Sequence, residues 1–125
     1  MLSMKLTEKK TNIYFDNPYW SNKLKLSYLQ RRIIVHSILY YQLNESVIDD
    51  FQYDGLSRQL VSLMKETSKE ECGKSTYWYC MYDFDGTTGF DLYSRLNKRD
   101  KVHLTDIAYR VLDCYMYKKY ERGKR

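Results

Sequence analysis

Two aspartates and a tyrosine near the middle of the chain have a spacing that could form one binding surface. Asp50, Tyr53 and Asp54 stand at i, i+3 and i+4, so in a helix they share one face of the first turn. The pair Tyr40-Tyr41 precedes them, near the predicted end of another helix. Tyrosine rings stack against flat cations, and carboxylates accept hydrogen bonds from sugar hydroxyls. The pattern also fits a capped helix start with core tyrosines, because the helix dipole alone favours aspartate there.

The hydrophobic pattern predicts a helical hairpin around these residues. The segment 20–43 contains no Gly or Pro, and apolar residues recur in it every three or four positions up to Tyr41. A second helix is expected from Asp49, with Gln52 completing a capping box. Because only a short polar segment joins the two helices, they should form an antiparallel hairpin within residues 20–66.

The rest of the chain completes a mainly α fold, a small single domain built around this central hairpin. The aromatic stretch 76–84 indicates extended backbone, either a short strand or an ordered loop across the hairpin. A turn, a short helix over 90–96 and a last helix over about 104–119 should follow. We therefore expect three parts: a polar N-terminal segment 1–17, one helical domain over 18–119, and a basic tail 120–125.

Composition narrows the class of protein. A chain of 125 residues, 43% hydrophobic and 30% charged, matches one ordinary globular domain. No segment is apolar enough to cross a bilayer and the N-terminus lacks a hydrophobic signal region, so we expect a cytoplasmic protein without membrane contact. Cys72, Cys80 and Cys114 are odd in number and widely spaced, which favours buried free thiols over disulfides or a zinc site.

The net charge of +5 is concentrated at the C-terminus. Such an excess can mean salt-sensitive attraction to nucleic acid. A basic terminus is more often a solvated end, although some serve as interaction arms. Nucleic acid is therefore one partner considered for this end of the chain, through the basic tail 120–125 and the residues just before it. The basic residues concerned are Lys118, Lys119, Arg122, Lys124 and Arg125.

The run from Tyr40 to Leu56 resembles the N-terminal Ia segment of bacterial NAD-dependent DNA ligases. That segment has paired aromatics, a short loop, an aspartate and then Tyr-Asp-x-Leu, and the chain aligns with it without a gap. In the family these residues hold the nicotinamide mononucleotide (NMN) half of NAD, the leaving group when the enzyme lysine is adenylated. The resemblance implies NMN or NAD as ligand, with five candidate binding residues: Tyr40, Tyr41, Asp50, Tyr53 and Asp54.

Other features separate the chain from a ligase. The adenylated lysine of the family stands in Lys-x-Asp-Gly, but here Asp54-Gly55 follows Gln52 and Asp85-Gly86 follows Asp83. The chain has no space for the nucleotidyltransferase, OB-fold or helix-hairpin-helix modules either, and the similarity fades after about residue 65. We therefore expect no enzyme and no catalytic residues.

The chain most resembles the short, stand-alone ligase-related proteins of bacteriophages, which implies the cytoplasm of a host cell. Two functions stay open. The first is a non-catalytic module that binds NMN or NAD weakly, because half of the ligand's contacts are missing. The alternative is a phage accessory or anti-defence protein that binds a host protein or a nucleic-acid-processing complex through its tyrosine-rich surface.

Weaker motifs suggest other sites. The run Asp83-Phe84-Asp85-Gly86-Thr87 resembles the nucleophile loop of haloacid-dehalogenase-type phosphatases, but only about forty residues follow it, so a polar turn is favoured. Asp83, Asp85 and Asp91 could hold a cation, without the spacing of an EF-hand. His36 and His103 lack a ligand-spaced partner, so we expect structural histidines and no metal.

Overall fold

The structure is a computed structural model of the chain and describes residues 19–87 and 89–123. No strand occurs within these residues, and the expected mainly α, small single-domain fold is confirmed. The polar N-terminal segment expected over 1–17 lies outside the described residues. In chain order the elements are α2 (Asn22–Ser37), the π-helix η1 (Ile38–Gln42), α3 (Asp50–Glu66), α4 (Lys69–Gly73), α5 (Trp78–Met81), α6 (Leu92–Arg95) and α7 (Lys98–Gly123).

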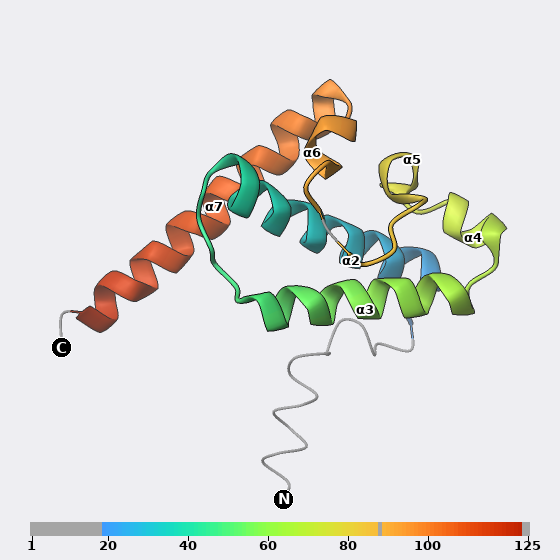
Figure 1. Ribbon diagram of the computed structural model, residues 1–125, viewed down its shortest axis with the longest axis horizontal. Helices are drawn as coiled ribbons and strands as arrows, with labels where there is room; N and C mark the ends of the chain where they lie inside the picture. The colour runs from blue at the N-terminus through green and yellow to red at the C-terminus, as the bar shows by residue number, and fades with distance from the viewer. Residues whose placement is uncertain (1–18, 88, 124–125) are drawn as a thin grey trace, which may run out of the picture.

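Helices α2 and α3 lie side by side and run in opposite directions (Figure 1). Each begins at a side-chain cap. Ser21 Oγ accepts the Leu24 amide at 3.3 Å. Asp49 Oδ1 accepts the Gln52 amide at 2.7 Å, and Gln52 Oε1 accepts the Asp49 amide at 3.0 Å. This capping box satisfies amides that the first turn of α3 leaves unpaired, so α3 starts where the sequence predicted.

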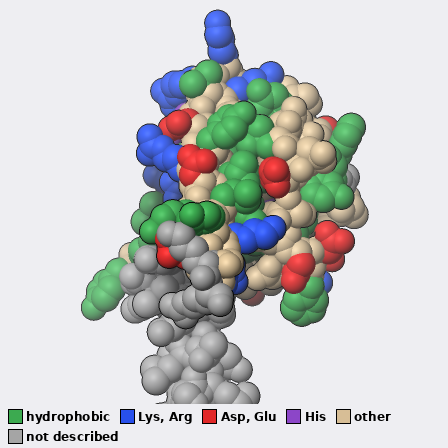
Figure 2. All heavy atoms as spheres, turned by 90° about the vertical axis from the view of Figure 1, so that its left-hand side faces the viewer, with side chains coloured by type: hydrophobic (Ala, Val, Ile, Leu, Met, Phe, Trp, Pro, Cys, Tyr) green, Lys and Arg blue, Asp and Glu red, His purple; other side chains and the backbone are tan. Residues whose placement is uncertain are grey.

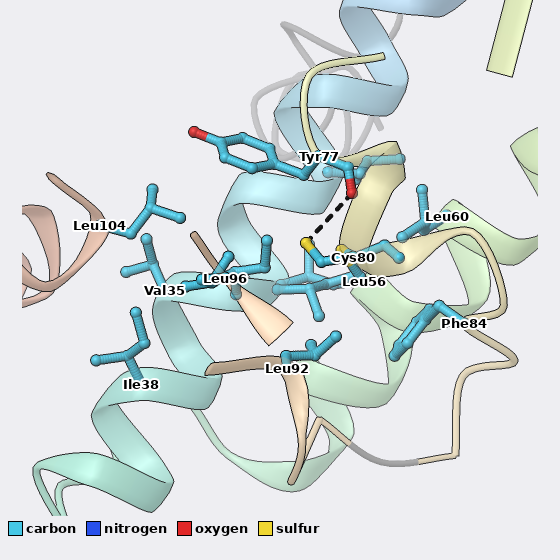
Figure 3. Close-up of a cluster of buried hydrophobic side chains, with 14 of the residues drawn as sticks. Val35, Ile38, Leu56, Leu60, Tyr77, Cys80, Phe84, Leu92, Leu96 and Leu104 are labelled. Atoms are coloured by element: carbon cyan, nitrogen blue, oxygen red, sulfur yellow. Dashed lines mark hydrogen bonds between the residues drawn. The ribbon is translucent and has the colours of Figure 1, made fainter. Parts of the chain in front are cut away.

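The core lies between the hairpin and the short helices that cover it. Figure 3 shows Leu56 and Leu60 of α3 close to Cys80 of α5. Leu92 of α6 lies on the same side of the core, and Leu104 of α7 lies beside Val35 of α2. Burial of this apolar surface is the main stabilising contribution to the arrangement. Helix α2 and the start of η1 supply the deepest layer, with five apolar side chains that are 0% exposed: Leu26, Leu29, Ile33, Ile34 and Ile38.

The extended backbone expected over 76–84 is wrong, because the stretch contains α5 and flanking turns. The start of this stretch is held by Gln30, a buried residue of α2. Gln30 Oε1 accepts the Tyr77 amide at 3.1 Å, and Gln30 Nε2 donates to Ser75 Oγ at 2.9 Å. The sequence interpretation relied on the aromatic content and overlooked the helical spacing of the buried residues. The buried residues of the stretch are spaced at i, i+3, i+4 and i+7: Tyr77, Cys80, Met81 and Phe84.

Helix α7 is longer than predicted at both ends, and its second half leaves the body of the protein (Figure 1). It begins at Lys98, where Asn97 Oδ1 accepts the Asp100 amide at 2.8 Å. Its buried residues are Asp100, Leu104 and Ala108, and none over 109–123 is buried. Within the part of the chain that the structure describes, no helix combines the length and apolarity needed to cross a membrane.

Candidate ligand-binding pocket

A pocket opens between the end of α2, the segment 43–49 and the start of α3. We call it the site pocket. Its volume is 260 Å³, slightly below the roughly 300–1,000 Å³ of typical small-molecule sites. A pocket of this volume can enclose a flat ring and part of a sugar, so the rest of a larger ligand would lie outside it. All five candidate residues line it: Tyr40, Tyr41, Asp50, Tyr53 and Asp54.

Tyr40 and Tyr41 reach the pocket because α2 ends in the π-helix η1. The Leu43 amide donates to the Ile38 carbonyl at 3.0 Å, an i to i+5 bond that adds one residue to the turn. In a continuous α-helix Tyr41 would follow Ile34 and Ile38 along the buried stripe, as the sequence pattern predicted. It is instead 40% exposed. Such π-helical turns occur frequently at functional sites.

The two tyrosine rings form an aromatic wall. Their centroids are 4.8 Å apart, with the planes at 79°. Tyr41 also meets Phe90 edge-on, at 5.4 Å between centroids. Tyr40 is 53% exposed, so the wall has a solvent-facing part. Exposed aromatic faces of this kind attract flat, positively charged groups.

The start of α3 supplies an acidic side. The Asp49 carboxylate is engaged in the helix cap. Asp50 in the first turn and Asp54 one turn later are exposed, and neither side chain has a hydrogen bond or ion pair to another described side chain. Glu45 joins this side of the pocket. The chain turns into the segment at Asn44, whose φ of 56° is left-handed, a conformation that asparagine tolerates better than most residues.

Tyr53 combines a place in the pocket with a structural contact. Its Oη lies 2.9 Å from Ser37 Oγ, and Ser37 donates to the Ile33 carbonyl at 2.8 Å, so Tyr53 donates to Ser37. Burial raises the pKa of the Tyr53 phenol, which keeps the donating proton in place. The Gly89 backbone covers this bond closely enough that a Cβ there would overlap both Ser37 Oγ and Tyr53 Oη.

Sequence reasoning did not place His36 and Ser37 in the site, yet both line the pocket. His36 Nδ1 is buried without a hydrogen-bond partner among the described residues. Burial, assisted by the positive charge of Arg32, lowers the pKa of His36 to about 4, so the imidazole is neutral at physiological pH. The signal in the sequence was the i, i+4 spacing from His36 to Tyr40.

The second aspartate cluster belongs to a surface turn. Arg95 pairs with both carboxylate oxygens of Asp83 and, at 3.2 Å, with Asp91. The hydrogen bonds from Arg95 lower the pKa of the Asp83 carboxyl. Asp85 Oδ1 accepts the Thr87 amide at 3.0 Å, which is the local bond typical of a polar turn. Within residues 19–87 and 89–123 no group of three potential metal-ligating side chains occurs.

No protein-family model, curated protein or solved structure matches this chain. The resemblance to the ligase Ia segment therefore rests on the motif between Tyr40 and Leu56 alone. A functional assignment has to come from the chemistry of the site pocket.

Proposed function

We propose that this chain is a non-catalytic, ligase-related module that binds a nicotinamide nucleotide, NMN or NAD, in the site pocket, in the cytoplasm of a host cell. The observation that carries the proposal is that all five residues suggested by the motif line one pocket. They come from η1 and α3, on opposite sides of the segment 43–49. The packing of a helical hairpin alone does not require aromatic and acidic side chains to converge in this way.

The chemistry of the lining supports this ligand class. The faces of Tyr40 and Tyr41 suit the flat, positively charged nicotinamide ring. Asp50 and Asp54 carry unengaged carboxylate oxygens that can accept hydrogen bonds from ribose hydroxyls. Because the Lys-x-Asp-Gly lysine is absent, the ligand would be bound and released without adenylation. The expected role is to sense or sequester the nucleotide.

The proposal is tested by titrating the protein with NMN and with NAD while following its backbone NMR signals. We expect saturable shifts confined to η1 and the start of α3, with weak affinity. Asp50→Ala and Tyr40→Ala should abolish them, since both residues are exposed and their loss leaves the core intact. Asp106→Ala and Tyr109→Ala on α7 are matched controls that should bind normally. Undiminished binding in folded Asp50→Ala would contradict the assignment.

A second candidate function, binding of a host protein or a nucleic-acid-processing complex, is favoured by the projecting half of α7. Four large hydrophobic side chains there are well exposed: Tyr109 at 51%, Met116 at 48%, Tyr117 at 64% and Tyr120 at 62%. Exposed aromatic and methionine side chains are enriched in protein interfaces. The last nine residues carry five basic side chains and one acidic, so +4 of the net charge of +5 lies at this end.

This second candidate function is tested by capture of a protein partner. A partner should be captured by the wild-type chain and lost with the double variant Met116→Ala, Tyr117→Ala, whose side chains are not part of the core. Capture should persist in Asp50→Ala and should not depend on added NMN. Loss of capture in Asp50→Ala, or equal capture by the α7 variant, would count against α7 as the contact surface.

A further inference from the structure

The lining of the site pocket carries charge of one sign. Its acidic residues are Glu45, Asp49, Asp50 and Asp54, and no Lys or Arg is among the described residues that line it. Figure 2, which faces the side of the molecule where η1 lies, shows Asp and Glu side chains scattered among hydrophobic ones, with the largest group of Lys and Arg side chains at its left edge. The candidate binding site is therefore lined by negative charge, although the chain as a whole carries a net positive charge.

The nearby cation Arg32 is directed elsewhere. It stands one turn before His36 on α2, and its guanidinium carbon lies 5.8 Å from the centre of the Tyr28 ring. Its Nη1 donates to Tyr28 Oη at 3.5 Å. A phosphate bound beside the pocket would thus meet carboxylates and no bidentate partner among the described lining residues, although arginine is the side chain that proteins most often use for such a group.

We propose that the site pocket selects the cationic, unphosphorylated half of its ligand, so that nicotinamide riboside binds more tightly than NMN. This inference rests on the proposed function and specifies its ligand. The ring cation is attracted both by the carboxylates and by the tyrosine faces. The phosphate is repelled by the same carboxylates, because like charges brought together oppose binding.

His36 fits this selection. Since burial keeps its imidazole neutral, the residue adds no positive charge that would repel a cationic ring. Its Nδ1 lacks a partner among the described residues, and an unprotonated ring nitrogen accepts a hydrogen bond. A carboxamide N–H on the ring is a suitable donor. Because His36 also lines the site pocket, it is the candidate acceptor for this amide.

The experiment compares nicotinamide riboside, NMN and reduced nicotinamide riboside, whose ring is uncharged, by NMR titration at low ionic strength. We expect the riboside to bind about tenfold more tightly than NMN, a difference of the size that a few partly screened like-charge contacts produce. The reduced riboside should bind more weakly than the oxidised one. Added salt should narrow the gap between riboside and NMN, because it screens both the attraction and the repulsion.

Charge-neutral variants give the sharpest readout. Asp54→Asn and Glu45→Gln should weaken riboside binding and bring the ratio of the two affinities toward one, whereas Asp106→Asn on α7 should leave the ratio unchanged. Equal or tighter binding of NMN by the wild-type protein overturns the selection and leaves the proposed function standing. Absence of shifts with every ligand in a folded sample overturns both. If Asp54→Asn and Glu45→Gln leave the ratio of riboside to NMN affinity unchanged, the carboxylates are not the cause of the preference.

Discussion

Substitution of Gly89 by alanine should break the link between the pocket and the core. Gly89 is buried above the hydrogen bond from Tyr53 to Ser37. An added Cβ would overlap both oxygen atoms and lie 3.1 Å from Ser37 Cβ, a distance tighter than ordinary contact. The Ser37 side chain is only 2% exposed and cannot move outward freely. Either the turn that carries Gly89 lifts, or Tyr53 leaves its position in the site pocket.

The cost has two parts. Overpacking of a well-packed site by one methyl group costs about 1–3 kcal/mol. Loss of the Tyr53 to Ser37 hydrogen bond adds roughly 1 kcal/mol, since both groups are largely buried. We therefore expect Gly89→Ala to lower the free energy of unfolding by about 2–4 kcal/mol, which for a chain of this size lowers the Tm by about 10 °C.

Urea and thermal unfolding measure this cost, and Gly55→Ala is the matched control. Gly55 lies within α3 beside Asp54, and a Cβ there meets nothing within 4 Å. Alanine is the better helix former, so the control should gain up to about 1 kcal/mol. In a background with Ser37→Ala and Tyr53→Phe, the Gly89→Ala cost should fall by at least half. A cost under about 0.5 kcal/mol, or an undiminished cost in that background, would refute the steric reasoning.

Three further predictions concern other parts of the structure. The pKa of His36 is about 4 in the folded protein and 6.5 in the unfolded chain. The unfolded chain therefore binds the proton first, and the free energy of unfolding falls as the pH drops from 6.5 to 4. His36→Gln should remove about 3 kcal/mol of this loss in urea unfolding, and an unchanged pH profile would contradict the prediction. Cys114 is exposed, so the buried thiol expected from the sequence is wrong at this position. Cys114→Ser should therefore abolish rapid reaction with a thiol reagent, and rapid labelling of a buried cysteine would contradict this prediction. The Tyr79 hydroxyl donates to the carboxylate of buried Asp100 at 2.6 Å. Tyr79→Phe should therefore lower the free energy of unfolding by about 1–3 kcal/mol in urea unfolding. A neutral effect would show that Asp100 finds another donor.

Elements with local causes could be predicted from the sequence. The capping box at Asp49 uses residues three apart, and the apolar stripe of α2 recurs with the helical period, so the start of α3 and the buried face of α2 follow from neighbouring residues alone. The spacing of Asp50, Tyr53 and Asp54 likewise depends only on α3 being a helix. The acidic side of the pocket could be predicted for that reason.

Features set by distant contacts could not be predicted. The stretch 76–84 was assigned from its aromatic content, but its turns are fixed by Gln30, more than forty positions away. The extra residue in η1 has no propensity signal, and it decides whether Tyr41 joins the core or the pocket. The role of Ser37 could not be predicted either, since its partner Tyr53 comes close only when the two helices are packed together.

The five candidate residues differ in how far the fold alone accounts for their presence, and this difference shows which residue to substitute. Tyr53 is needed for its hydrogen bond to Ser37, and Asp50 stands in the first turn of α3, where the helix dipole stabilises an acid. Asp54 lies one turn further, where that effect has faded, and its carboxylate has no described side-chain partner. An inherited scaffold without a ligand would gain nothing from Asp54. A change in ligand affinity without a change in stability in Asp54→Asn would therefore separate a working site from a retained hairpin.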